Sequence, residues 1–160
     1  MFSPLHLHRI CRWLHLRKVR FFPIAVQRIN YFFTGCDLPG DVQIGRRVRF
    51  QHYGSGVVIH NRVTIGDDVM IMPHVVIGQN VRAGVAIQKL DHIYIGNRVI
   101  IGAGAKIIAT GTLRVGDGSV IGANAVLLTS LPDDCTAVGI PAKILKRKDD
   151  MPPEVPKPVE

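Results

Sequence analysis

The side chains in this sequence that are best suited to catalysis are histidines. Seven occur among 160 residues, and two of them, His52 and His92, lie beside interruptions of an otherwise regular pattern. An imidazole titrates near neutral pH and can take a proton from a hydroxyl group as that hydroxyl attacks a carbonyl carbon. The three cysteines are an odd number without close spacing, so they predict neither a disulfide framework nor a zinc site. The sequence therefore favours proton transfer by histidine in a reduced, cytoplasmic protein.

The pattern around these histidines is a six-residue repeat. Large apolar residues recur at every sixth position in four runs, which are Leu38–Ile44–Phe50, Ile59–Ile65–Ile71–Ile77, Ile95–Ile101–Ile107 and Val115–Ile121–Leu127. A helix would need apolar spacing near 3.6, and an amphipathic strand would need a spacing of two. A solenoid of short strands fits instead, because each hexad can form one side with an inward aliphatic residue and a corner that glycine allows. At three hexads per turn, the 13 repeats predict about four coils.

Breaks in the repeat predict where the chain leaves the regular wall. The step from Phe50 to Ile59 is nine residues, which indicates a three-residue insertion near positions 52–56. Farther along, the repeat would place Lys89 at an inward position, so we expect residues 83–92 to leave the coil as a loop. Insertions in solenoids usually lie on the binding face. Both histidines are therefore expected in loops that protrude from the solenoid.

The charge is concentrated at the N-terminal end. The net charge is +8, and residues 1–36 carry six basic residues and no acidic one. This local excess argues against nucleic-acid binding by the domain as a whole. Residues 4–33 read as two helices broken at Pro23. We expect a basic amphipathic helical cap over 1–34, a β-helix domain over 35–145 and a disordered, mobile tail over 146–160.

The role of the cap stays open between three alternatives. It can cover the open end of the solenoid, which needs covering for solubility. It can contact other subunits. It can also contact the anionic inner face of the cytoplasmic membrane, because it carries Trp and Phe beside its basic residues.

The repeat segment resembles the hexapeptide-repeat acyltransferases, and among them the serine acetyltransferase-like branch. The matching stretches are RRVRFQHYGSGVVIH, LDHIYIGNRVIIGAGAKII, VGDGSVIGANAVL and VGIPAKIL, within residues 46–145. The resemblance implies an all-β solenoid that is a left-handed parallel β-helix, preceded here by the helical segment and followed by the Pro-rich tail. It also implies acetyl-CoA as the acyl donor, no metal, and a homotrimer or a dimer of trimers.

The resemblance implies roles for individual residues. His52 matches the general base, and His92 matches a second active-site histidine that we expect to position substrate or thioester across a subunit boundary. Gln51 and Asp91 are the expected acceptor-binding residues. The residues expected to contact acetyl-CoA are Gly102, Ala103, Ala105, Ala123 and Lys143, with Lys143 near the phosphates.

One departure from the family concerns the acceptor. The family carries Asp where this chain has Gln51, and the ammonium group of serine calls for a carboxylate partner, whereas a sugar hydroxyl does not. The short basic, aromatic N-terminus also looks like that of small acetyltransferases that modify surface polysaccharides. We therefore expect an O-acetyltransferase that acts on a sugar or a surface-polysaccharide precursor.

Two other functions stay open. One is the serine O-acetyltransferase reaction of cysteine biosynthesis. The other is a non-catalytic β-helix scaffold or a carbonic-anhydrase-like metal protein, for which the spacing of His60 and His74 does not provide the expected three-histidine metal site.

Overall fold

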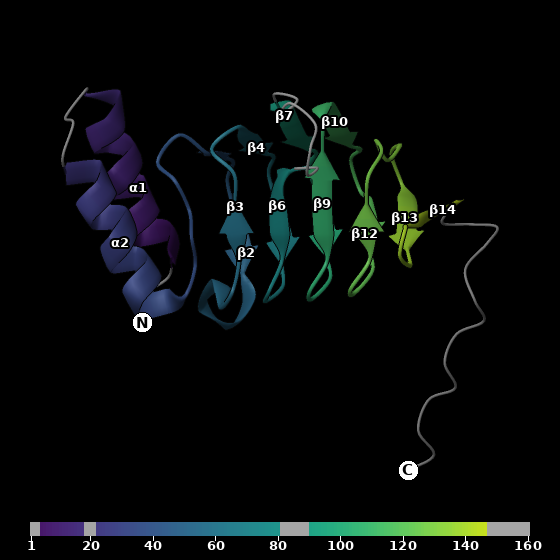
Figure 1. Cartoon of the computed structure of the whole chain (residues 1–160), viewed down its shortest axis with the longest axis horizontal. Coiled ribbons are helices and arrows are strands. Elements are labelled where there is room, and N and C mark those ends of the chain that lie inside the picture. The colour runs from purple at the N-terminus through teal and green to yellow at the C-terminus, as the bar shows by residue number, and fades with distance from the viewer. Residues whose placement is uncertain (1–3, 18–21, 81–89, 147–160) are drawn as a thin grey trace, which may run out of the picture.

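The computed structural model describes residues 4–17, 22–80 and 90–146. These residues form a three-sided prism of short strands with a pair of helices across one end (Figure 1). The expected tail, apart from its first residue, and most of the expected loop at 83–92 lie outside the described residues.

Each side of the prism is one sheet, and the chain visits the three sheets in turn. The first sheet contains β1 (Gln43–Ile44), β4 (Val63–Ile65), β7 (Leu90–Ile95) and β10 (Gly111–Val115). The second sheet contains β2 (Arg49–Phe50), β5 (Met70–Ile71), β8 (Ile100–Ile101), β11 (Val120–Ile121), β13 (Cys135–Val138) and β14 (Lys143–Lys146). The third sheet contains β3 (Val58–Ile59), β6 (Val76–Gln79), β9 (Lys106–Ala109) and β12 (Val126–Leu127).

Successive coils pair in parallel and keep the repeat in register. In the second sheet Phe50 pairs with Ile71, Ile71 with Ile101 and Ile101 with Ile121. The final pair, β13 with β14, is antiparallel and ends the described part of the prism. Because equivalent positions of the repeat lie one above another, their side chains form continuous stacks inside the prism.

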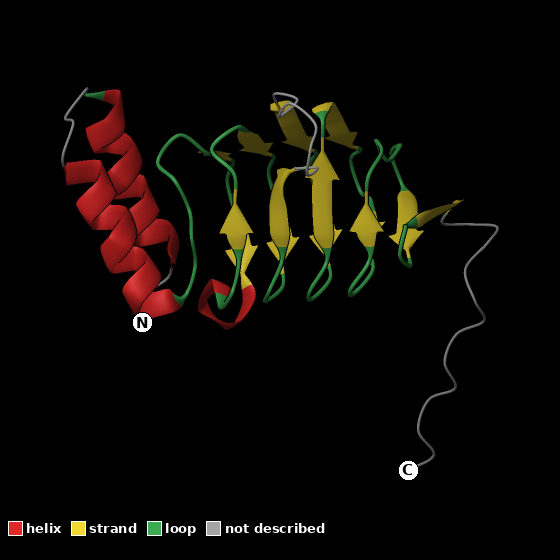
Figure 2. Ribbon diagram, viewed as in Figure 1, coloured by secondary structure: helices red, strands yellow, loops and turns green. Residues whose placement is uncertain are grey.

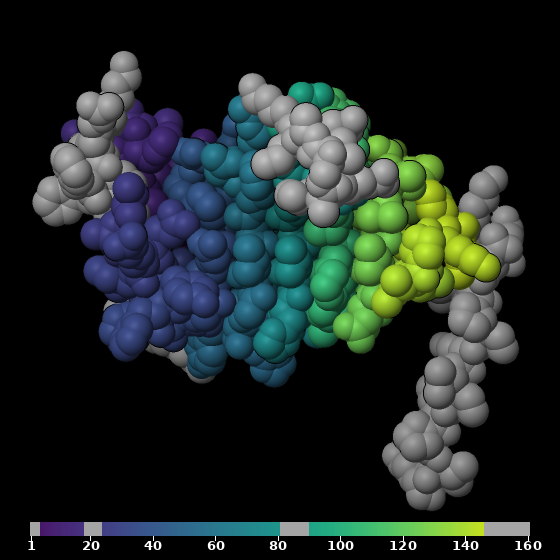
Figure 3. All heavy atoms as spheres, in the orientation of Figure 1, coloured from purple at the N-terminus to yellow at the C-terminus, as the bar shows by residue number. Residues whose placement is uncertain are grey.

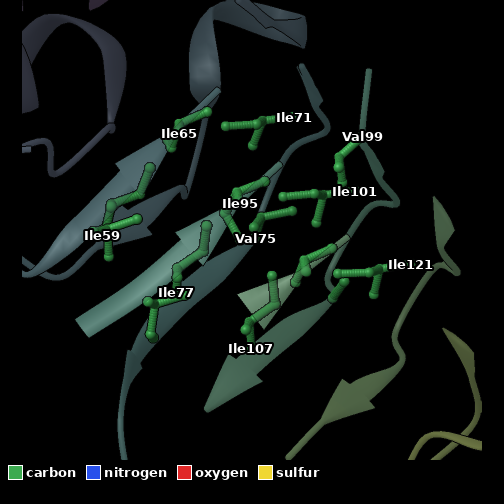
Figure 4. Packing of buried hydrophobic residues seen from close by; sticks show 14 of the residues in the cluster. Ile59, Ile65, Ile71, Val75, Ile77, Ile95, Val99, Ile101, Ile107 and Ile121 are labelled. Carbon is green, nitrogen blue, oxygen red and sulfur yellow. The ribbon is translucent and has the colours of Figure 1, made fainter. Parts of the chain in front are cut away.

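The core consists of these stacks, as Figure 4 shows for Ile59, Ile77 and Ile107. All three are at most 1% exposed. Burying one such aliphatic side chain stabilises the fold by about 1.5–3 kcal/mol. In the first coil Ile44 and Phe50 are only partly buried.

The helices are α1 (Pro4–Leu16) and α2 (Phe22–Thr34), and they pack side by side over the first coil (Figure 1). The sequence predicts a break at Pro23, but Pro23 lies in the first turn of α2. Proline is tolerated there because the first-turn N–H groups need no partner inside the helix. The first helix ends at Leu16 and the second begins at Phe22, and residues 18–21 between them lie outside the described residues.

The placement of His92 also differs from expectation, because it lies on β7 and not in a protruding loop. In the pairing of β7 with β10, Leu90 opposes Gly111 and His92 opposes Thr112, so Asp91 is an extra residue. Leu90 and Ile93 are both buried, which leaves Asp91 and His92 together on the outer side. This β-bulge turns two successive polar side chains outward, where a regular strand would send one inward.

Candidate active site

One edge of the prism gathers most of the predicted site residues. This edge, called here the turn edge, consists of the turns that join the second sheet to the third, at residues 51–57, 72–75, 102–105 and 122–125. Figure 2 shows the first of these turns as a short red helix at the lower border, in a row with the later turns. Backbone hydrogen bonds join the row, from His74 N to Ser55 O (2.8 Å), Gly104 N to Pro73 O (2.9 Å) and Asn124 N to Ala103 O (2.8 Å).

His52 lies in the first of these turns, at the insertion that the sequence predicts. The turn is the 3₁₀ segment η1 (Gln51–Gly54), in which His52 has φ 47° and Tyr53 has φ 58°. Both residues adopt the left-handed conformation, which non-glycine residues seldom occupy and which marks locally constrained backbone. Both side chains are exposed, so the imidazole of His52 is accessible at the edge.

The next turn supports this insertion. His74 has φ 61°, and its ring lies directly over Gly56, where an added Cβ would collide with Nδ1. Gly56 itself has φ +67°, so both the backbone conformation and the close ring require glycine at this position. His74 therefore buttresses the turn that carries His52.

The predicted acetyl-CoA contacts divide into two groups. Ala103 and Ala123 lie on the turn edge in successive coils, and both are at least partly exposed. Ala105 is fully buried in the core, so its methyl group does not face this edge, contrary to expectation. Gly102 has a packing role, because a Cβ there would lie 2.5 Å from the backbone nitrogen of Ala123.

Lys143 lies at the far end of the same edge. It is exposed, begins β14 and is paired with Val138 at the point where β13 ends. The backbone links to the preceding coil run from Val126 N to Gly139 O and from Ala142 N to Val126 O. From the turn of His52 to this point the edge spans about four strand spacings, or roughly 19 Å. A long, extended ligand with an anionic end could lie along it.

His92 lies on a different surface, the outer face of the first sheet. Its Nε2 atom is 2.8 Å from Oγ1 of Thr64 on the neighbouring strand β4. Its ring is tilted against the ring of Tyr94, with centroids 4.4 Å apart. The guanidinium carbon of Arg114 lies 4.2 Å from the centroid of the Tyr94 ring. The hydroxyl and the aromatic ring together hold the imidazole in one orientation.

Positive charges surround this histidine. Partial burial lowers the pKa of His92 below its ordinary value, and the positive charges of Arg62 and Arg114 lower it further. Arg62 also donates from Nη1 to the backbone oxygen of Asp91 at 3.5 Å. The neutral imidazole is thereby favoured near pH 7, and an anionic group on a ligand would meet two guanidinium groups here.

The remaining predicted residue, Gln51, begins η1 and is partly exposed beside His52. Within one chain, then, Gln51 and His52 lie on the turn edge, whereas Asp91 and His92 lie on the first sheet. The sequence did not identify Thr64, Arg62, Tyr94 and Arg114. Only the outward position of Thr64 within its hexad signals such a role, because these residues are far apart in sequence and converge through strand pairing between neighbouring coils.

The edge between the first and second sheets differs from the turn edge. Its polar groups bond to one another, from Asn97 N to Asp117 Oδ1 (2.9 Å) and from Asp117 N to Asp133 Oδ1 (2.8 Å). Nearby, the Arg46 backbone N–H and guanidinium hold the pKa of the Asp67 carboxyl below its usual range. This polar ladder joins successive coils. Among the described residues, no group of three or more His, Cys, Asp or Glu is arranged to hold a metal ion.

Several known proteins with similar sequences and structures are serine acetyltransferases. The chain is 39% identical over 140 residues to a serine acetyltransferase of Helicobacter pylori, covering 88% of this chain and 78% of that protein. Among solved structures, serine acetyltransferase from Brucella abortus superposes with TM-score 0.79 at 29% identity, over 89% of this chain and 55% of that one. A serine acetyltransferase in complex with CoA gives TM-score 0.78 at 30% identity, over 89% and 55% of the two chains. No family model matches the sequence.

These similarities confirm the expected fold, the serine acetyltransferase-like branch and acetyl-CoA as donor, and they overturn the expected acceptor. The left-handed parallel β-helix is confirmed as the fold. The expectation of a sugar or surface-polysaccharide acceptor is wrong, because the relatives are serine acetyltransferases. The argument from Gln51 failed because one neutral side chain does not set the charge of a site. Asp91, Arg62 and Arg114 supply both signs of charge around His92.

Proposed function

The chain belongs to the serine acetyltransferase family, whose acyl donor is acetyl-CoA, and we propose that it transfers an acetyl group to the hydroxyl of L-serine. The observation that carries this proposal is the turn edge, where an exposed His52 with constrained backbone begins a row of turns that continues through Ala103 and Ala123 towards Lys143. Acetyl-CoA would lie along this row, with its thioester near His52 and its phosphates near Lys143.

The reaction needs one proton acceptor and a site for a transient negative charge. His52 takes the proton of the serine hydroxyl while the oxygen attacks the thioester carbonyl carbon. The carbonyl oxygen becomes an oxyanion, which backbone N–H groups at the turns stabilise. When the intermediate collapses, the C–S bond breaks and the leaving sulfur of CoA receives the proton from His52. O-acetylserine and CoA are the products.

The surroundings of His92 support an amino acid as the acceptor. The serine carboxylate would pair with Arg62 or Arg114, and its ammonium group with the carboxylate of Asp91. His92, oriented by Thr64, would then donate to or accept from the substrate as a neutral imidazole. Asp91 thus takes the role that the neutral Gln51 cannot fill.

We further propose that the active site forms between two subunits of a homotrimer. Within one chain His52 and His92 lie on different surfaces, the turn edge and the first sheet. Parallel packing of two prisms would bring the turn edge of one subunit against the first sheet of the next. Each site would then contain His52 from one chain and His92 from its neighbour.

The acceptor is tested by measuring CoA thiol release from acetyl-CoA with L-serine, L-alanine and a panel of sugars. We expect turnover with L-serine, and none with L-alanine, which lacks the hydroxyl. His52→Ala should lower kcat by at least about 100-fold, as expected for loss of a general base. Turnover with sugars but not with L-serine would reject the acceptor, and an unchanged rate in His52→Ala would reject the base.

The shared site is tested by mixing two inactive variants. His52→Ala and His92→Ala subunits, unfolded together and reassembled, would form some sites that keep both histidines. We expect part of the activity to return in the mixture and in neither variant alone. Mixed assemblies without recovered activity would show that each site uses histidines of a single chain.

A further inference from the structure

The two helices at the end of the prism contact the first coil through several polar side chains on their inner side. On α1, Arg12 Nη1 donates to the backbone oxygens of Asp41 and Val42 at 3.3 and 3.2 Å. His15 Nε2 lies 2.6 Å from Oδ1 of Asp41. On α2, Gln27 Nε2 donates to Oδ1 of Asp37 at 2.7 Å. These contacts fix which side of each helix faces the first coil and which faces away.

The side that faces away from the coil is apolar. Large hydrophobic side chains are exposed along both helices: Ile10, Trp13, Leu16, Ile24, Ile29, Tyr31, Phe32 and Phe33. Phe32 is 82% exposed, Phe33 73% and Leu16 68%. Figure 3 shows the helical pair forming one whole end of the molecule. Many large apolar side chains exposed along both helices at this end indicate an interaction site.

The same surface is positively charged. Arg9, Arg17 and Arg28 are exposed, and residues 1–36 contain no acidic residue. The guanidinium carbon of Arg17 lies 4.3 Å from the Trp13 ring centroid. Trp beside Arg is typical of a membrane–water interface, where the indole enters the headgroup region and the guanidinium stays with the phosphates.

The charge of this surface discriminates between two partners, a second copy of the chain and an anionic lipid membrane. A second copy would bring two acid-free, basic surfaces together, and their mutual repulsion opposes that contact. An anionic lipid surface complements the arginines and also receives the aromatic side chains. No helix in the described residues is long and apolar enough to cross a membrane. Two 13-residue helices, each about 20 Å long, can instead lie flat on the interface.

We propose that the outer surface of α1 and α2 docks the protein on anionic lipid bilayers. Trp13, Phe32 and Phe33 enter the interfacial layer, and Arg9 and Arg28 pair with lipid phosphates. The prism then projects from the bilayer, so that the turn edge and the first sheet stay open to soluble substrates. The proposal is independent of the acceptor, because none of these residues belongs to the proposed active site.

The experiment uses vesicles and the intact chain. Trp13 is the single tryptophan, so its emission reports directly on this surface. We expect a blue shift and co-sedimentation with vesicles of phosphatidylglycerol and phosphatidylcholine (30:70), and neither with phosphatidylcholine alone. Binding should weaken as NaCl rises from 50 to 500 mM, because exposed charges are screened.

Two variants separate the apolar and the electrostatic contributions. Arg9→Gln with Arg28→Gln should weaken vesicle partitioning about 30-fold, since each basic residue near an anionic surface contributes about 1 kcal/mol. Phe32→Ser with Phe33→Ser should weaken it at least as much, and the large exposure of both rings means that folding should be unaffected. Circular dichroism and turnover of soluble substrates should match the parent protein in both variants.

A matched control removes the same charge elsewhere. Arg49→Gln with Arg98→Gln removes two exposed charges from the prism wall, and we expect partitioning within about twofold of the parent. Equal binding by the helix and prism variants would overturn the proposal, because net charge alone would then explain binding. Absence of binding at 50 mM NaCl would also overturn it, as would concentration-dependent self-association through the helices in place of lipid binding.

Discussion

We expect His8 to make the packing of α1 on the first coil depend on pH. His8 lies on the buried side of α1 and is 2% exposed. Among the described residues, its Nε2 atom has no hydrogen-bond partner. Burial lowers the pKa of the imidazole from its ordinary 6.5 to about 4, opposed by a backbone hydrogen bond at Pro39 and assisted by the charge of Arg12. The folded protein therefore holds His8 neutral over a range in which the unfolded chain protonates it.

The sign and size of the effect follow from that difference. Well above pH 6.5, His8 is neutral in both the folded and the unfolded chain, so its titration costs no folding stability. As the pH falls from 6.5 towards 4, only the unfolded state takes up the proton, so stability is lost. At 1.36 kcal/mol per pKa unit, the full loss is about 3 kcal/mol. Between pH 7.5 and 5.0 the loss attributable to His8 is about 2 kcal/mol.

Urea unfolding followed by Trp13 fluorescence measures this loss, because the indole lies on the same helix. We expect the parent protein to lose about 2 kcal/mol more than His8→Leu between pH 7.5 and 5.0. His6→Gln, an exposed histidine on α1, should follow the parent. If the parent and His8→Leu lost the same stability over this range, His8 would not be the coupled group.

Three further predictions concern the site and the wall. Thr64→Val should lower kcat/KM for the acceptor about fivefold by removing about 1 kcal/mol of hydrogen bonding to His92, and Thr64→Ser should restore it. The KM for acetyl-CoA should not change. Gly102→Ala should destabilise the fold by about 1–3 kcal/mol in thermal unfolding. Gly78→Ala should not, because no atom of the described residues lies within 4 Å of the added Cβ. Lys143→Gln should raise the KM for acetyl-CoA about fivefold with no change for the acceptor, and equal KM values would exclude a phosphate contact.

The two halves of the proposed site arise from different structural devices. His52 is presented by a turn whose left-handed residues are held by His74 and Gly56. His92 is presented by a β-bulge on a central strand, with Thr64 on the neighbouring strand as its hydrogen-bond partner. Both devices constrain the backbone that carries the histidine, and at His92 the contact with Thr64 also orients the imidazole before substrate binds.

The sequence alone was enough to identify the solenoid, because the inward position of each hexad depends only on local strand geometry. Ile71, Ile101 and Ile121 therefore stack as their spacing predicts. The nine-residue step also located the turn of His52, since an insertion must leave a wall whose register is otherwise continuous.

Only the tertiary structure decided the surroundings of His92. Thr64 and Arg114 lie 28 residues before and 22 residues after it, and they meet it because β4 and β10 flank β7. The pairing of β7 with β10 also contains the bulge that turns Asp91 and His92 outward together, which no periodicity in one strand reveals. The net charge around His92 depends on all the charged residues that strand pairing brings near it. Gln51 lies on the turn edge, so its neutral side chain gave no information about the charges on the first sheet, and the arginines around His92 became evident only once the coils were stacked.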